Sequence, residues 1–346
     1  MSPAPASFLD GLDAQARELL LAASTPVSFM AGATLVRHGE PARGAYVLRQ
    51  GTVDAEVTLP GGEKLVVARL GPGGVFGEMA LIELGTCTAT VRATSPVDGW
   101  FVSNEDFRAL VSQRIPAAIH LQHAVTSIIA AKLAALNAQL LDCTTPEDRP
   151  SRAVAAGVDP LAGAARSRHA SFHAAAFLPR LPFFEHFTAD EVDEVAAAGS
   201  YVELARGQGI FSQGTMAASV FLVVRGAAEI VHMSGPCERR VAVLGPGQMI
   251  GYTAVLSERA HGAHAFAREA ALLLEIPAPA FRELYFSERS VSTRLRAAVQ
   301  RSLLASMART NRALTRLLSQ ARLEEATREG KALEAAYAAQ LTAAAD

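Results

Sequence analysis

An internal repeat constrains the fold of this chain more than any other feature of its sequence. Residues 8–51 match residues 183–226 at a constant shift of 175 positions. From residue 71 onward the shift becomes 174, which places Gly71-Pro72-Gly73 on Gly245-Pro246-Gly247. One residue more or less in a turn explains the change of shift. The sequence therefore predicts two copies of one domain in tandem.

Each copy has the pattern of a small β domain that begins with one short helix. Helices are predicted at residues 13–23 and 188–197, where Asp or Thr stands at the position that caps a helix N-terminus. Short alternating segments separated by turns then indicate strands, and longer helical stretches begin at Asn104 and Pro279. The fold class predicted is mainly β with α. The strands expected are 34–37, 45–49, 52–58, 64–70 and 101–102 in the first copy, and 272–276 as the closing strand of the second.

The length and composition of the chain allow two packed domains. It has 346 residues, of which 50% are hydrophobic and 19% charged. Pro146, Pro150 and Pro160, among scattered small residues, indicate a linker between the copies. The expected organisation is a first domain with its following helix at 1–141, a linker at 142–176, a second domain at 177–290 and a helical tail at 291–346.

The stretch GPGGVFGEMALIELGTCTATVRA, residues 71–93, has the pattern of a phosphate-binding site in the first copy. Its glycines allow sharp turns and close approach of a ligand to the backbone. Residues 78–82 can form about one helical turn, whose free N–H groups and positive dipole end suit a phosphate. The alternating residues 88–93 then indicate a strand.

Residues 76–93, FGEMALIELGTCTATVRA, resemble the phosphate-binding cassette of the cyclic-nucleotide-binding domain superfamily, which includes the catabolite activator protein and protein kinase A regulatory subunits. The resemblance implies that each copy closes into a jelly-roll-like β-roll over its cassette. It also implies that Gly77 binds a cyclic phosphate through its backbone N–H and that Glu78 accepts from the ribose 2′-hydroxyl. The ligand-binding residues expected from it are Phe76, Gly77, Glu78, Met79, Ala80, Cys87, Thr88, Ala89 and, on the helix after the roll, Lys132.

Cys87 stands where the family has the arginine that pairs with the phosphate. A charge-assisted hydrogen bond contributes about 1.5–3 kcal/mol, so its loss weakens affinity for cAMP or cGMP by about one to two orders of magnitude. Beside an anion-binding helix start, the Cys87 thiol would favour its thiolate form. The ligand therefore stays open between cAMP, cGMP, a cyclic dinucleotide and a ligand without a cyclic phosphate.

The second cassette, GPGQMIGYTAVLSERAHGAHAFA, departs from the first at its polar positions. Tyr252 stands at the position of Glu78, and a phenol does not reproduce the two acceptor oxygens of a carboxylate. His261 stands at the position of Cys87, and Arg259, two residues earlier, could reach a phosphate. We expect a degenerate copy retained for folding or dimer contacts. The alternative ligand-binding set in this copy is Gly251, Tyr252, Arg259 and His261.

The segment from about Val291 onward has the pattern of one long amphipathic helix. An apolar stripe along it predicts a homodimer, paired as a coiled coil through residues 291–346. Residues 289–322 also contain eight arginines and no acidic residue, which indicates a solvated face or, alternatively, an acidic partner such as DNA or a protein. The stripe consists of Leu295, Val299, Leu303, Met307, Leu314, Leu318, Leu333, Tyr337 and Leu341.

Charge, cysteines and motifs narrow the functional classes. A net charge of −2 gives no general attraction to nucleic acid or membrane. No stretch is taken as membrane-spanning or as a signal peptide, so we expect a cytoplasmic protein. The three separated cysteines predict neither disulfides nor structural zinc, and no catalytic, cofactor or metal-binding motif is recognised. An enzyme is not expected.

The sequence favours a ligand-sensing regulatory protein. Its first domain would bind a cyclic nucleotide and signal to an unidentified effector protein by repacking of the helix that follows. The alternative is an interaction scaffold with two inactive cassettes. A transcriptional regulator that binds DNA through the arginine-rich tail comes third, because no compact helix-turn-helix follows either domain, and nucleic acid is not an expected partner.

Overall fold

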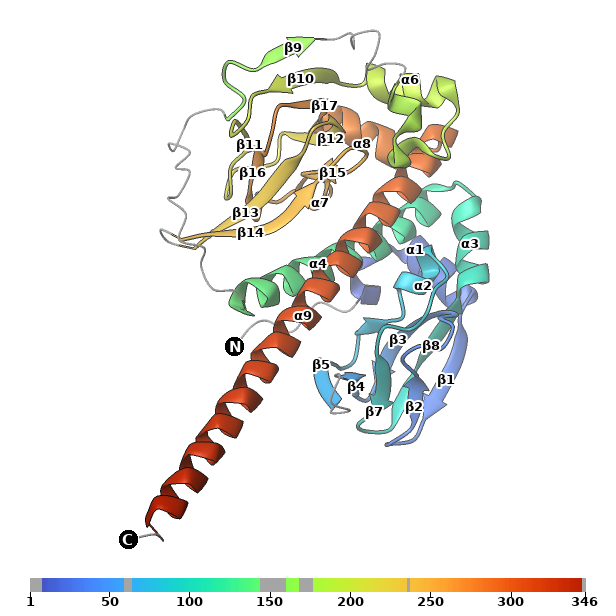
Figure 1. The fold of residues 1–346 in the computed structure, drawn as a ribbon. Helices are drawn as coiled ribbons and strands as arrows, with labels where there is room; N and C mark the ends of the chain where they lie inside the picture. The colour runs from blue at the N-terminus through green and yellow to red at the C-terminus, as the bar shows by residue number, and fades with distance from the viewer. Residues whose placement is uncertain (1–7, 59–63, 144–159, 168–176, 235–236, 344–346) are drawn as a thin grey trace.

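The computed structural model describes residues 8–58, 64–143, 160–167, 177–234 and 237–343, and shows two β domains on either side of a pair of long helices (Figure 1). Each domain has two antiparallel sheets, so it is a β-sandwich flanked by helices. The long helix α9 (Ser290–Ala343) follows the second domain. The fold predicted from the repeat, two β domains and a long C-terminal helix, is confirmed.

The first domain contains two four-stranded sheets, with strand orders β1-β8-β3-β6 and β2-β7-β4-β5. Strand β1 was not expected, because Pro26 interrupts its pattern. It lies at a sheet edge, where a proline is tolerated because one side of the strand needs no ladder hydrogen bonds. The bounds are η1 (Phe8–Gly11), α1 (Ala14–Ala22), β1 (Thr25–Phe29), β2 (Thr34–Val36), β3 (Gly44–Gln50), β4 (Val53–Thr58), β5 (Lys64–Leu70), β6 (Val75–Phe76), α2 (Met79–Ile82), β7 (Thr90–Ala93), β8 (Val97–Ser103), α3 (Asn104–Ser112) and α4 (Pro116–Cys143).

The second domain repeats this arrangement, with sheets β15-β12-β17-β10-β9 and β11-β16-β13-β14. Its additional strand β9 pairs with β10 and comes from the segment 142–176 that was expected to be a linker. Leu161 from the same segment is buried in the core of the second domain, whereas 144–159 and 168–176 lie outside the described residues. The bounds are β9 (Ala165–Ser167), η2 (Leu178–Arg180), η3 (Pro182–Phe184), α6 (Ala189–Ala197), β10 (Ser200–Leu204), β11 (Gly209–Phe211), β12 (Ser219–Arg225), β13 (Ala228–Ser234), β14 (Cys237–Leu244), β15 (Met249–Ile250), α7 (Tyr252–Leu256), β16 (His264–Ala267), β17 (Ala271–Pro277) and α8 (Ala278–Phe286).

Helices α1 and α6 begin at the capping residues that the sequence indicated. The Asp13 carboxylate accepts a hydrogen bond from the backbone N of Ala16 at 2.7 Å. Thr188 and Glu191 form a reciprocal capping box at the start of α6. Each cap satisfies N–H groups that have no partner within the helix.

Helices α4 and α9 cross between the two domains and pack against each other (Figure 1). Arg296 on α9 is fully buried and donates to Gln122 Oε1 at 2.9 Å and to the backbone oxygen of Tyr285 at 2.6 Å. Further along the helices, polar pairs continue the contact. We call this row the α4–α9 seam; it comprises Gln122, Thr126 and Asn137 on α4 and Arg296, Gln300 and Thr310 on α9.

The apolar stripe of α9 is covered by this chain itself over the first part of its length. Leu295, Val299, Leu303 and Met307 are buried in one core that also contains residues of α4 and of both domains. For these four residues, the prediction that a second chain covers the stripe is wrong, because α4 of the same chain lies there. The side chains of the remaining stripe residues Leu318, Leu333, Tyr337 and Leu341 lie outside the described residues, and a homodimer through the rest of the tail stays a prediction.

Several arginines of residues 289–322 also have internal partners. Arg289 pairs with Glu194, and Arg294 Nε lies 2.8 Å from Glu191 Oε2. Arg296 is buried in the α4–α9 seam. The interpretation of this segment as a solvated face is therefore wrong at Arg296, whereas Arg289 and Arg294 stay partly exposed while they pair with acidic residues of the second domain.

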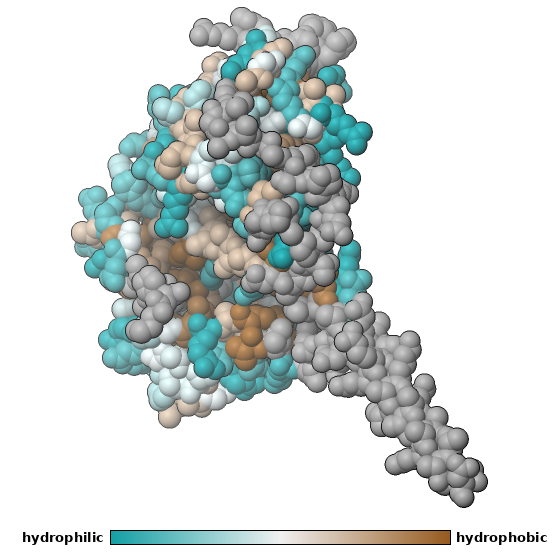
Figure 2. All heavy atoms as spheres, turned by 90° about the vertical axis from the view of Figure 1, so that its left-hand side faces the viewer, coloured by the Kyte–Doolittle hydropathy of each residue, from teal (hydrophilic) through white to brown (hydrophobic). Residues whose placement is uncertain are grey.

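Helix α4 is unusually apolar and is only partly covered. By length and composition its residues Pro116–Leu141 would suffice to cross a membrane, although no membrane-spanning stretch was expected. Only 28% of that window is buried inside the molecule. Figure 2 shows apolar surface gathered in a hollow at about mid-height of this face. The α4–α9 seam nevertheless gives α4 a structural role between the two domains.

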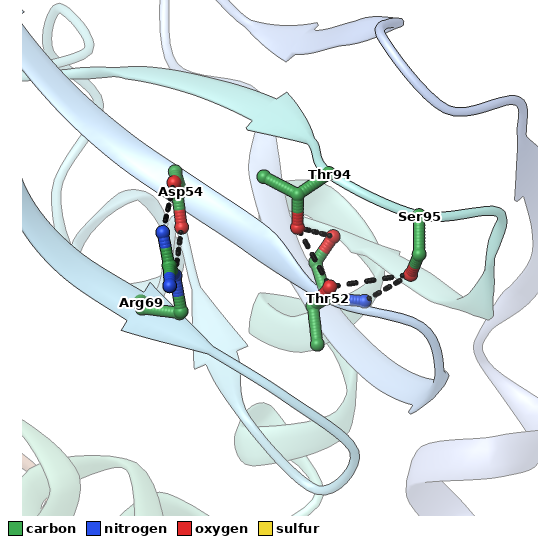
Figure 3. Close-up of polar contacts among 5 residues, drawn as sticks. All are labelled: Thr52, Asp54, Arg69, Thr94 and Ser95. Carbon is green, nitrogen blue, oxygen red and sulfur yellow. Dashed lines mark hydrogen bonds and ion pairs between the residues drawn. The ribbon is translucent and has the colours of Figure 1, made fainter.

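Two groups of polar contacts connect neighbouring strands of the first domain (Figure 3). Arg69 on β5 donates two hydrogen bonds to the Asp54 carboxylate on β4, at 2.7 and 2.9 Å. This arrangement lowers the pKa of Asp54. Thr52 Oγ1 lies 2.6 Å from Thr94 Oγ1 and 3.2 Å from Ser95 Oγ. These contacts join β4 to β5 and to the end of β7, away from the cassette.

Replacing Arg296 by methionine should destabilise the protein by about 2–4 kcal/mol, because buried acceptors of Gln122 and Tyr285 would lose their donor. The control is Arg312→Met on the same helix, where the arginine is exposed and the expected change is below about 0.5 kcal/mol. Urea unfolding of the full chain measures both. Equal, small changes would show that the seam does not hold the helices together.

Candidate functional site

The first cassette begins where β6 ends in a left-handed turn at Gly77. This residue has φ +78°, and a Cβ atom there would lie 2.5 Å from the backbone oxygen of Gly44 on β3. Only glycine fits both conditions. The chain then enters the short helix α2, in which Ala80 N donates to Gly77 O at 3.0 Å and Leu81 N to Glu78 O at 3.1 Å. Gly77 thus presses the start of α2 against β3.

Glu78 is buried, with a side chain that is 4% exposed. Its carboxylate oxygen Oε2 lies 2.7 Å from Nζ of Lys132 on α4, and the same Nζ donates to the backbone oxygen of Val75 at 2.9 Å. The sequence had named Glu78 and Lys132 separately, and the structure brings them together. A buried carboxylate needs such a partner, because burial without one costs several kcal/mol.

Aromatic side chains form the wall next to this cassette. Tyr46 on β3 stacks on Phe76 with ring centroids 4.9 Å apart, and the ring of Phe101 lies 4.9 Å from Tyr46 on another side. Phe29 meets the edge of Tyr46 at 6.2 Å. Phe76 was expected at the site from the sequence. Tyr46 was not expected there. A cluster of this kind provides an apolar face beside a polar carboxylate.

Helix α2 is tied to the helices that follow the roll. The side-chain amide of Asn104, the first residue of α3, donates to the backbone oxygen of Ala80. Ala80 is buried, and Met79 is half-buried against the main core. Asn104 was expected only as the beginning of a helix, so this contact was missed. It connects any movement of α2 to α3.

Cys87 lies in a loop held by backbone hydrogen bonds to the turn after β2. Cys87 N donates to Glu40 O and Gly39 N donates to Cys87 O, each at 2.8 Å. Burial and the nearby Glu40 carboxylate raise the pKa of the Cys87 thiol. The expectation of a thiolate is therefore wrong, and the position of the family's arginine carries a neutral thiol. Thr88 beside it is exposed, and Ala89 is half-buried against the core of the roll.

The second cassette has the same backbone and different side chains. Gly251 has φ +82°, and α7 follows directly. Tyr252 is buried, burial raises its pKa, and its hydroxyl interacts with Ser306 on α9, which accepts a hydrogen bond from Arg309 at 2.8 Å. Ser306 is the residue that the shift of 174 pairs with Lys132. The two positions that hold an ion pair in the first copy therefore hold a neutral polar pair in the second.

An aromatic pair occupies the rest of the second cassette. The imidazole of His261 stacks on the ring of Phe211 with centroids 3.7 Å apart and planes at 9°. His261 Cε1 would lie 3.3 Å from a Cβ atom at Gly251, so the imidazole packs directly on the cassette turn. Burial lowers the pKa of His261 to about 4. Arg259 is exposed. Of the expected alternative set, His261 thus packs on the turn at Gly251 with a lowered pKa. Tyr252 is buried, and Arg259 points no charge into a buried position.

Other titratable groups do not assemble into a second site within the described part of the chain. His120 Nδ1 lies 2.7 Å from Asp13 Oδ2, and His123 packs on the rings of Tyr285 and Phe286. Burial lowers the pKa of His123 to about 4. No group of three or more His, Cys, Asp or Glu residues that could hold a metal ion occurs among the described residues. His120 is thus a surface residue, and His123 is a packing residue.

Comparison with known proteins gives two matches to one family. Residues 26–114 and 201–288 match the family described as the cyclic nucleotide-binding domain, and together they cover just over half of the chain.

Solved structures with similarity to this chain include the regulatory domain of Toxoplasma gondii protein kinase A with cAMP, at 21% identity over 87% of this chain and 92% of that one, with a TM-score of 0.32. The regulatory subunit of a cAMP-independent protein kinase A from Trypanosoma cruzi, bound to guanosine, is 15% identical over 80% and 79%, with a TM-score of 0.29. The N-terminal domain of a transcriptional regulator from Streptomyces coelicolor A3(2) is 29% identical over 35% of this chain and 86% of that one, with a TM-score of 0.33.

Replacing Gly77 by alanine should destabilise the protein by about 2 kcal/mol or more, because the new Cβ atom would combine a strained φ with a collision against backbone. Gly85→Ala is the matched control in the same cassette, since nothing lies within 4 Å of a Cβ atom there. Thermal unfolding compares the two variants. Similar midpoints would contradict the account of the turn.

The stability of the protein should fall as the pH is lowered from about 6.5 to about 4. The folded-state pKa of His261 is about 4, below the ordinary value of about 6.5, so the unfolded chain binds a proton that the folded chain excludes. The loss from this residue is on the order of 3 kcal/mol at pH 4. His261→Gln should lose part of this pH dependence, whereas His186→Gln, at an exposed position, should keep all of it. Parallel pH profiles for all three proteins in urea unfolding would refute the assignment.

Proposed function

This chain belongs to the cyclic nucleotide-binding domain family, with two such domains in tandem, and from that premise we propose that it is a cytoplasmic, non-enzymatic regulatory protein that senses a ribose-bearing ligand. The first domain binds the ligand, a cyclic nucleotide such as cAMP or cGMP or a related nucleoside. The second domain is structural. Ligand binding repacks helix α4 and changes the surface offered to an effector protein.

The carboxylate of Glu78 is the observation that supports this assignment. It lies at the start of α2, behind a turn that only Gly77 can form and beside the Tyr46–Phe76 stack. A carboxylate can accept hydrogen bonds from two sugar hydroxyls at once, and the aromatic wall suits a base. The second copy offers Tyr252 at this position, and His261 fills the adjoining space. The difference between the copies favours one working site per chain.

The chemistry of Cys87 bears on the ligand class. Its thiol is neutral, so this position supplies no positive charge to a phosphate. Without the charge-assisted hydrogen bond of the family's arginine, phosphate recognition is weaker by about 1.5–3 kcal/mol. Sugar and base contacts then contribute a larger share of the affinity. Because one similar protein is bound to cAMP and another to guanosine, both kinds of ligand belong in the test.

Helix α4 is the proposed output element. It carries Lys132, which contacts Glu78, and also the polar residues of the α4–α9 seam. A shift of α4 toward or away from the first cassette would therefore change its contact with α9 and with the second domain. A ligand shifts this equilibrium to the extent that it binds one helix arrangement more tightly than the other.

An interaction scaffold without a ligand is the second candidate. It is favoured by the neutral Cys87 at the arginine position and by the closed second cassette. A homodimer through residues 291–346 and an unidentified effector protein remain proposals under both functions.

Ligand binding should raise the thermal unfolding midpoint of the full chain. The panel is cAMP, cGMP, cyclic di-GMP, guanosine and adenosine, with 5′-AMP for comparison. A ligand at 100 times its Kd adds about 2.7 kcal/mol to the free energy of unfolding. Glu78→Gln should abolish the shift, whereas Glu83→Gln, an exposed acid of the same cassette, and Tyr252→Phe should retain it. If no compound of the panel raises the unfolding midpoint at millimolar concentration, the sensor function is refuted and the interaction scaffold is the remaining candidate.

A further inference from the structure

The carboxylate that the proposed function assigns to the ligand is not accessible in this structure. The Glu78 side chain is 4% exposed, and Lys132 Nζ lies 2.7 Å from Oε2. The same Nζ donates to the backbone oxygen of Val75 on β6. One ammonium group therefore contacts both the strand before the cassette turn and the residue at the start of α2. A ligand hydroxyl cannot reach Glu78 unless what covers the carboxylate moves.

The covering residue belongs to the helix between the two domains. Lys132 is one-third exposed and lies on α4 between Thr126 and Asn137, which contact Gln300 and Thr310 on α9 at 3.0 and 2.9 Å. A shift of the α4 segment that carries Lys132 would also shift Thr126 and Asn137, because all three lie on one continuous helix. Opening of the cassette by such a shift would therefore also change the α4–α9 seam.

The repeat supplies a second instance of the same contact. At the shift of 174, Tyr252 replaces Glu78 and Ser306 replaces Lys132, and the Tyr252 hydroxyl again interacts with the residue on the following helix. The contact between the cassette and the following helix is therefore present in both copies with different chemistry. In the first copy the contact is an ion pair between Lys132 and the Glu78 carboxylate, which can also accept hydrogen bonds from a ligand. In the second copy the contact joins two neutral side chains, and no carboxylate is present.

We propose that Lys132 is an autoinhibitory clasp: its ion pair with Glu78 holds α4 over the first cassette, and a ligand with neighbouring hydroxyl groups competes with Lys132 for that carboxylate. The proposal rests on the proposed function, since it concerns the same site. Binding of the ligand releases Lys132, and α4 then moves relative to α9. The Tyr252–Ser306 pair of the second copy stays closed.

The clasp predicts that its removal tightens ligand binding. When only a fraction of the molecules is open, the apparent Kd is the intrinsic Kd divided by that fraction. Lys132→Met keeps an unbranched side chain that is one atom shorter and removes the charge, so the Kd for the tightest ligand of the panel should fall about tenfold. Lys132→Arg restores the cation and should stay within about twofold of wild type. Lys64→Met removes an equivalent charge from an exposed site on β5 and should also leave the Kd unchanged.

The test is isothermal titration of these four proteins, together with amide hydrogen exchange of the wild type. Adding the ligand to the wild-type protein should speed amide hydrogen exchange in the part of α4 after Lys132. This measurement does not depend on whether any variant folds. Ligand-free Lys132→Met should already show the faster exchange, and ligand should add nothing further.

The outcomes separate the clasp from the proposed function. Binding to wild type and Lys132→Met with equal Kd, or weaker binding to the variant, would overturn the clasp and leave the sensor intact; weaker binding would make Lys132 a ligand contact. Slower exchange in α4 on adding ligand to wild type would overturn the clasp as well. No binding to either protein would overturn the sensor and the clasp together, whereas binding only to Lys132→Met would support both.

Discussion

The ion pair between Glu78 and Lys132 is the interaction on which the functional organisation of this structure depends. A carboxylate that is almost fully buried requires a compensating partner, and here the partner comes from α4 rather than from the roll. The pair thereby couples the cassette to the helix between the domains. The glycine turn at Gly77 and the hydrogen bond from Asn104 to Ala80 fix the position of α2, so Glu78 is presented to α4 from a defined place.

The α4–α9 seam makes one structural unit of the two domains. Arg296 is fully buried, and amide and carbonyl groups of Gln122 and Tyr285 accept its hydrogen bonds. The buried guanidinium of Arg296 and its acceptors have few alternative arrangements, because a shift of one helix along the other would leave buried donors and acceptors unpaired. The apolar residues around it belong to one core shared by both domains. A movement of α4 is therefore confined to discrete packings, which is the property that a switch needs.

The sequence predicted the repeat, the two β domains, the caps at Asp13 and Thr188 and most strands, because these follow from local periodicity and turn chemistry. Strand β1 was missed because Pro26 is acceptable only at a sheet edge, and an edge is a property of the sheet. The apolar stripe of α9 indicated that this helix packs against another helix. The stripe alone does not indicate whether that helix is α4 of the same chain or belongs to a second chain. Glu78 and Lys132 were both named, whereas their contact depends on the angle of α4.

A crystal structure of the chain grown with the nucleotide or nucleoside that binds most tightly would show whether one cassette of the two binds a ligand. We expect one ligand per chain, with its sugar hydroxyls on Glu78 and with the His261–Phe211 stack undisturbed. A ligand in the second cassette, or a ligand in the first that leaves Glu78 without contact, would refute the assignment of the site.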